Sequence, residues 1–230
     1  MPTVQAVVAL LEGERGYLEK KSSAQLDSKT ANAGYNNYTK YTRDIDAAGI
    51  NDARYQGQAW CCSLAIWPEL HLSGAAEARE RFYLPVPYNC EWLAGYFRSA
   101  GAWYVQPQVG DFIFFRTARY RYAHVGRVVA VDSTTVYTIE GNTSGDGGVV
   151  ANGGGVFRKS YSLGSWNIVG YGRPKWKDGE RDAPAEKKEN EKKLDMQVRM
   201  LRRGMKGADV KTLQAALIAY GFSCGSAGAD

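Results

Sequence analysis

The chain has 230 residues, of which 44% are hydrophobic and 23% are charged, and its formal net charge at pH 7 is +5. These values are typical of a globular protein with one full domain and a smaller appended segment, and the modest positive charge suits a polyanionic partner. No stretch is long and apolar enough to span a membrane, and neither zinc-finger spacing nor an RNA-binding aromatic motif occurs, so we expect no membrane and no nucleic acid as partner.

The first half of the chain shows helical patterns on either side of a polar stretch. Residues 3–11 carry valine and leucine at helical spacing. Residues 20–58 are polar with few core signals, and we expect a long structured loop there. Residues 72–82 and 90–100 predict two further helices, the second with Asn89 as its N-cap.

Between the polar loop and these helices lies a segment with a cysteine at its start. After Cys61 the apolar residues Leu64, Ala65 and Pro68 follow at i+3, i+4 and i+7, which predicts a buried helical face that ends at the proline. A thiol in the first turn of a helix lies near unpaired N–H groups and the positive end of the helix dipole, and both favour the nucleophilic thiolate. Cys61 is therefore a candidate nucleophile. The alternative is a small buried apolar residue, as most free cysteines are.

The second half of the chain changes to the short apolar runs and turn signals of strands. A basic and aromatic hairpin at residues 116–122 separates the first two of them. The predicted strands are residues 112–115, 123–131, 135–140, 156–161 and 167–171. Helices followed by a meander of strands indicate an α+β fold.

Three regions follow from the change in composition along the chain. We expect the α+β domain to cover residues 1–176. Residues 177–196 are rich in lysine and glutamate, which predicts a solvated linker. Residues 197–230 return to helical spacing, but the segment is too short to hold a core, so we expect a partial helical domain.

The chain has four cysteines, Cys61, Cys62, Cys90 and Cys224, and two histidines. The adjacent pair is not a CxxC motif, and with so few histidines we expect no structural zinc site. A disulfide framework is not expected in a domain of this size, although a Cys62–Cys90 pair stays open. No signal peptide precedes the first helix, so we expect the protein to be made in the cytoplasm and to act outside only after release by another factor.

A cysteine hydrolase needs a thiol, an imidazole within reach of it, and a polar group that orients the imidazole. His124 begins a predicted strand, where it can face the start of a packed helix. Glu140 ends the next strand, and Asn142 follows two residues later on the same face. Antiparallel neighbours would bring Glu140 or Asn142 beside His124. The alternative for Glu140 is a solvated strand end, and His71 is expected to have a surface or packing role.

Four short motifs follow one another along the chain: AWC at residues 59–61, PQVGD at 107–111, AHVG at 123–126 and YTIEGNT at 137–143. They resemble the CHAP domain (cysteine, histidine-dependent amidohydrolase/peptidase), which is common in phage endolysins and bacterial wall hydrolases. Two later glycine-rich segments, residues 150–155 and 170–174, also resemble it, so the resemblance covers about residues 5–176.

The resemblance implies a papain-like core in which helices pack on a small antiparallel sheet. It implies Cys61 as the nucleophile and His124 as the base. Glu140 would orient the imidazole, with Asn142 assisting or replacing it. Contacts with the substrate are expected from Gln58, Trp60 and Tyr122.

No cofactor is expected, although some relatives bind calcium beside the active site. Four oxygen-bearing side chains offer ligands here, but they lack the spacing of an EF-hand loop, and we expect a capped turn instead of a metal site. These residues are Asp44, Asp46, Asn51 and Asp52.

By resemblance the expected activity is hydrolysis of bacterial peptidoglycan by a monomeric, endolysin-type cysteine amidase or endopeptidase. Residues 204–214 resemble the first half of a small peptidoglycan-binding domain. The alternatives are an NlpC-type or transglutaminase-like cysteine peptidase, a wall-binding module with an inert cysteine, and a toxin-like effector on the same scaffold.

Overall fold

The computed structural model describes residues 2–50, 54–82, 89–145, 148–149, 153–176 and 207. The chain divides into two compact units, Met1–Asp182 and Ala183–Asp230, and every described helix and strand lies in the first. The predicted linker at 177–196 lies outside the described residues, as does the partial helical domain at 197–230 except for Gly207. Across the described part of the chain, no helix has both the length and the apolar character needed to cross a membrane.

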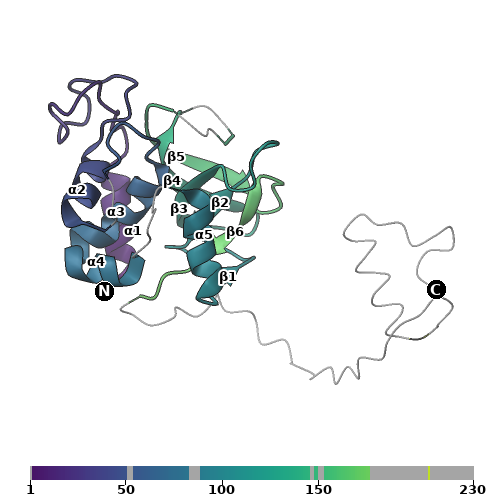
Figure 1. Cartoon of the computed structure of the whole chain (residues 1–230). Helices are drawn as coiled ribbons and strands as arrows, with labels where there is room; N and C mark the ends of the chain where they lie inside the picture. The colour runs from purple at the N-terminus through teal and green to yellow at the C-terminus, as the bar shows by residue number, and fades with distance from the viewer. Residues whose placement is uncertain are drawn as a thin grey trace. The chain divides into compact units, whose positions relative to one another are not determined.

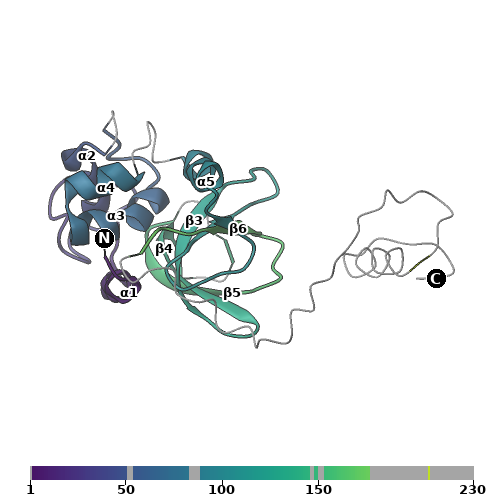
Figure 2. The same ribbon diagram turned by 90° about the horizontal axis from the view of Figure 1, so that it is seen from below.

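The first unit confirms the expected α+β fold, in which helices are followed by antiparallel strands. Four helices, α1 to α4, pack together beside the sheet, and the two views in Figures 1 and 2 agree on this arrangement. The helices are α1 (Val4–Gly13), α2 (Lys40–Ala48), α3 (Cys61–Ser73), α4 (Ala75–Phe82) and α5 (Cys90–Ser99). The strands are β1 (Trp103–Tyr104), β2 (Phe112–Phe115), β3 (His124–Val131), β4 (Thr135–Thr143), β5 (Gly155–Ser162) and β6 (Ile168–Gly172).

The strands form one antiparallel sheet with the order β1-β6-β2-β3-β4-β5, and Figure 2 shows how strongly this sheet curls. Strands β2 and β3 pair with Phe115 opposite His124, while β3 and β4 pair with Arg127 opposite Ile139. The start of β3 therefore lies beside the far end of β4. Helix α5 covers part of the sheet through Phe97, whose ring lies 5.0 Å from that of Phe112.

Helix α3 is the central helix of the unit. Its residues from Cys61 to Glu69 are all buried, because α3 packs on β3 and β4 and also against α1, α2 and α4. The helix continues through Pro68 to Ser73, so the prediction that it ends at the proline is wrong. A proline forfeits one backbone hydrogen bond, and packing on all sides of this helix outweighs that loss.

The expected loop at residues 20–58 contains a helix, α2, which the sequence analysis missed. Thr39 caps its start by accepting a hydrogen bond from the Thr42 amide, and Gly49 ends it in the left-handed conformation with φ of 61°. Tyr41 and Ile45 form its buried face. The cap, the apolar pair at i and i+4 and the closing glycine are all visible in the sequence, but the polar residues around them outweighed these signals.

A buried ion pair joins α3 to β3. The guanidinium of Arg127 donates hydrogen bonds to Glu69 Oε1 at 2.8 Å and to the Ala65 carbonyl at 2.7 Å. It also donates to the Gly110 carbonyl at 2.9 Å and lies 4.0 Å above the Phe112 ring. The helix that begins at Cys61 is thereby held against the strand that begins at His124.

Candidate active site

Cys61 is the first residue of α3, and no side chain caps this helix start. Its thiol is therefore near amide groups that lack an intrahelical partner, at the positive end of the helix dipole. The preceding residue, Trp60, is fully buried and donates its indole N–H to Glu19 Oε2 at 2.7 Å. This anchored ring holds the chain in place where it enters the helix.

The sulfurs of two further cysteines, Cys62 and Cys90, lie close to that of Cys61. Cys90, at the start of α5, has its Sγ 3.8 Å from that of Cys61 and 3.5 Å from that of Cys62. Hydrogen bonds from the Cys62 and Cys90 thiols, together with the hydrogen bond and charge of His124, hold the pKa of Cys61 well below its ordinary value. Hydrogen bonding to Cys61 raises the pKa of both neighbours. Cys61 is therefore the member of the trio that ionises first.

His124 and Glu140 form a fully buried pair. His124 Nε2 lies 3.0 Å from Glu140 Oε2, and both side chains have 0% exposure. Two hydroxyl groups fix the carboxylate: Thr138 donates to Oε1 at 2.6 Å, and Tyr161 donates to Oε2 at 3.2 Å. Neither hydroxyl was singled out in the sequence, although Thr138 lies two residues before Glu140 and so shares its face of the strand.

The two nitrogens of the His124 ring have different roles. Nε2 contacts the Glu140 carboxylate, whereas Nδ1 is buried and has no hydrogen-bond partner among the described residues. Burial alone would lower the pKa of His124, but the electrostatic interactions with Cys61 and Glu140 overcome this and raise it to about 9. The arrangement favours a thiolate–imidazolium pair, with Nδ1 as the nitrogen available to sulfur.

Gly126 makes the His124–Glu140 contact sterically feasible. A Cβ atom at this position would lie 2.6 Å from Glu140 Cγ and 3.4 Å from its Cδ. The Glu140 side chain therefore crosses the neighbouring strand over a residue without a side chain. This explains why the AHVG motif has a glycine at position 126, where a side chain would collide with Glu140.

Asn142 lies in an irregularity of β4. The register between β4 and β5 shifts between Glu140 and Thr143, and Asn142 has a φ of 56°. Strand alternation therefore does not carry through from Glu140 to Asn142, contrary to the same-face argument from the sequence. The Asn142 side chain is buried, and neither its oxygen nor its nitrogen has a hydrogen-bond partner among the described residues. The structure thus pairs His124 with Glu140, and a role for Asn142 stays a prediction.

The three residues expected to contact substrate lie in different environments. Gln58 is exposed just before α3, whereas the indole of Trp60 has no exposed surface and packs in the core. Tyr122 is half-buried, its hydroxyl accepts a hydrogen bond from Arg98 at 3.3 Å, and its ring lies edge-on to Trp103. Gln58 and Tyr122 are thus accessible to a ligand in this structure.

The residues considered for calcium have protein partners where they are described. Asp44 accepts hydrogen bonds from Arg43 and from the Trp67 indole, and Asp46 accepts one from the Tyr55 amide. Asn51 and Asp52 lie outside the described residues. In the described part of the chain, potential metal ligands instead lie close together at Cys61, Cys62 and Cys90.

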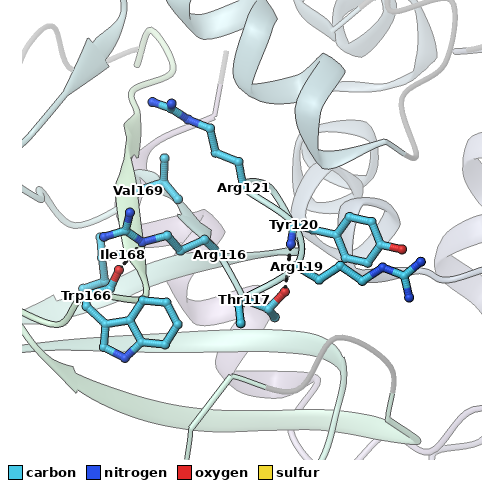
Figure 3. Close-up of a pocket in the computed structure, with 9 residues that line it drawn as sticks. Arg116, Thr117, Arg119, Tyr120, Arg121, Trp166, Ile168 and Val169 are labelled. Atoms are coloured by element: carbon cyan, nitrogen blue, oxygen red, sulfur yellow. Dashed lines mark hydrogen bonds between the residues drawn. The ribbon is translucent and has the colours of Figure 1, made fainter.

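A basic pocket of about 530 Å³ is formed by the loop between β2 and β3 and by the residues that lead into β6. Arg116 stacks near the Trp166 ring and Arg119 near the Tyr120 ring, as Figure 3 shows. Arg116, Arg119 and Arg121 form no ion pair with a carboxylate of the described residues. The same loop leads directly into His124, so unneutralised positive charge lies on the segment next to the imidazole.

A family model described as the CHAP domain matches residues 53–142. No curated protein and no solved structure matches the chain. The matched segment contains α3, α5, β2 and β3, and it therefore includes the sulfur cluster and the His124–Glu140 pair. The match supports the family of CHAP-domain peptidoglycan hydrolases for the segment of the chain that holds this site.

Proposed function

We propose that this protein is an endolysin-type peptidoglycan hydrolase that cleaves an amide bond of the wall peptide with Cys61 as nucleophile. The observation that carries the proposal is the placement of Cys61 at a helix start without a side-chain cap, together with the buried His124–Glu140 pair. The charge of His124 contributes to the lowered pKa of Cys61. Nucleophile, base and orienting group are the three parts that cysteine hydrolysis requires.

In the proposed reaction the Cys61 thiolate attacks the carbonyl carbon of the amide. The oxyanion that forms accepts a hydrogen bond from the Cys61 backbone N–H, and the exposed Gln58 side chain is the candidate second donor. The imidazolium of His124 then protonates the departing amine, which leaves an acyl-thioester on Cys61. His124 next removes a proton from water, and the hydroxide that results releases the acid and regenerates the thiolate.

Glu140 serves as a positioning residue. It holds Nε2 of His124, which leaves Nδ1 as the nitrogen for proton transfer, and its charge stabilises the imidazolium. The hydroxyls of Thr138 and Tyr161 keep the carboxylate oriented. The exposed arginine and aromatic side chains of the loop before His124 suit a glycopeptide with carboxylate groups, because guanidinium pairs with carboxylate and flat rings stack on sugars.

The test is hydrolysis of purified peptidoglycan with mass analysis of the fragments. Cys61→Ala should abolish release of new amino groups while the far-UV circular dichroism stays that of the wild type. Cys224→Ala, a cysteine outside the CHAP match, is the matched control and should retain the rate. Full activity in Cys61→Ala would refute the proposal, and the mass of the fragments tells a sugar–alanine amide from a peptide cross-bridge.

A further inference from the structure

Cys62 and Cys90 take part in no chemical step of the proposed hydrolysis, yet their sulfurs are packed around the nucleophile. The Sγ atoms of Cys61, Cys62 and Cys90 all lie within 4.8 Å of one another, and no disulfide joins them. Sequence spacing did not reveal this trio, since Cys90 lies 28 residues from Cys62 on another helix. The fold alone brings three thiols to one point.

The separation of the sulfurs matches a tetrahedral thiolate metal site. Zinc binds cysteine sulfur at about 2.3 Å, so two thiolates on a tetrahedral zinc lie about 3.8 Å apart. The Cys61–Cys90 sulfur distance is 3.8 Å, and the Cys62–Cys90 distance is 3.5 Å. One ion at the centre of the trio therefore needs only small movements of the side chains. A calcium ion does not fit the same place, because it takes oxygen ligands.

The ligands of this site are the three sulfurs. In the described part of the chain, the metal-ligating atoms that lie within 4.8 Å of one another are those of Cys61, Cys62 and Cys90. Zinc sites with three protein ligands keep a fourth position for water.

All three cysteines are buried. Cys61 and Cys90 have 4% and 7% relative exposure and Cys62 has none, so the site is largely shielded from bulk solvent.

We propose that Cys61, Cys62 and Cys90 form a three-thiolate binding site for Zn²⁺, with water at the fourth position, and that the bound ion blocks the nucleophile. Binding converts the three thiols to thiolates and releases their protons to solvent, with no change of oxidation state. The ion occupies the lone pair on the Cys61 sulfur that the hydrolysis needs. The blocking effect rests on the proposed function, whereas the metal site itself does not.

The binding test uses the reduced, chelator-treated full-length chain and Co²⁺, a spectroscopic substitute for Zn²⁺. One Co²⁺ per chain should bind with thiolate-to-cobalt charge-transfer absorption, and one equivalent of Zn²⁺ should displace it. Cys62→Ser and Cys90→Ser should each weaken binding by about 100-fold or more, since even the loss of a ligand-orienting residue costs about 10–100-fold. Cys224→Ser is the matched control and should bind as the wild type does.

Two results would overturn the metal site: wild-type protein without thiolate-to-cobalt absorption, or Cys90→Ser with unchanged affinity. A further measurement needs no variant. Zn²⁺ should protect Cys61, Cys62 and Cys90 from alkylation in the wild type, as read by peptide mass spectrometry, and labelling that Zn²⁺ does not slow contradicts the proposal.

The blocking effect is tested on peptidoglycan hydrolysis. One equivalent of Zn²⁺ should stop the wild-type reaction, and a chelator should restore it. Cys62→Ser, compared with its own metal-free rate, should need about 100-fold more Zn²⁺ for the same inhibition. Metal-free wild type that leaves the wall intact would overturn the proposed function alone, because the cobalt titration still decides the metal site.

Discussion

Replacement of Glu140 by glutamine is the most informative single change at the site. The carboxylate receives three donors on its two oxygens, from His124, Thr138 and Tyr161. Glutamine has the same size but only one acceptor oxygen, and its amide group is itself a donor. Glu140→Gln therefore removes the negative charge beside the imidazole and replaces one of the two acceptor oxygens by a group that can only donate.

The expected magnitude follows from the pKa of His124, which is raised from 6.5 to about 9. At about 1.4 kcal/mol for each tenfold change, this difference favours the imidazolium by about 3 kcal/mol in spite of burial, and Cys61 and Glu140 supply it together. Without the Glu140 charge, the pKa of His124 should fall, and the Cys61 thiolate should form only at higher pH. Since a positioned acid–base group contributes about 10²–10⁴-fold, we expect a rate loss in this range.

The assay combines the rate of wall hydrolysis with the pH dependence of Cys61 alkylation. Glu140→Gln should lose activity and shift the alkylation profile to higher pH. Thr138→Val keeps the carboxylate charge and loses one hydrogen bond, so its profile should stay close to that of the wild type. A Glu140→Gln protein with wild-type rate and an unshifted profile would refute the assignment of Glu140 as the group that charges and orients His124.

Three further predictions concern residues around the site. Gly126→Ala should lower the hydrolysis rate by about 100-fold, because its Cβ would meet Glu140 Cγ at 2.6 Å and displace the carboxylate; a rate equal to that of the wild type would exclude this clash. Glu69→Ala leaves the buried Arg127 charge without its carboxylate, which should lower the free energy of unfolding by about 3–5 kcal/mol. The melting temperature should fall by about 10 °C, and an unchanged melting temperature would contradict this. In chelator-treated protein, alkylation of Cys61 should slow less from pH 8.5 to pH 6 than that of an ordinary thiol, since its lowered pKa favours the thiolate. An ordinary thiol, with pKa about 8.5, would slow by more than about 100-fold, and such a drop would show an unperturbed thiol.

Local signals in the sequence predicted much of the fold. The apolar run at residues 112–115 is strand β2, and Asn89 caps α5 by accepting a hydrogen bond from the Glu91 amide. The apolar spacing after Cys61 predicted a helix start there, and the neighbouring strands predicted Glu140 or Asn142 beside His124; the structure has Glu140 in this place. Each of these depends on a cap, a run or neighbouring strands, all of which act over a short distance in the chain.

The features that the sequence did not predict depend on contacts between segments that are distant in the chain. Pro68 lies inside α3 because the helix is buried from Cys61 to Glu69, and Cys90 contacts the nucleophile from another helix. The extra residue in β4 that changes the setting of Asn142 is defined by pairing with β5. Trp60 was expected at the substrate, but it is buried against Tyr41 of the unexpected helix α2. None of these contacts has a signature in the local sequence.

The contact between Arg127 and α3 sets the alignment of the two halves of the site. One guanidinium group binds both the Ala65 carbonyl and the Glu69 carboxylate, which lie one helical turn apart. A slide of the helix by a single residue, about 1.5 Å along its axis, would break both bonds together, so no intermediate position is stabilised. These two bonds thus fix the axial position of the helix that begins at Cys61 relative to the strand that begins at His124.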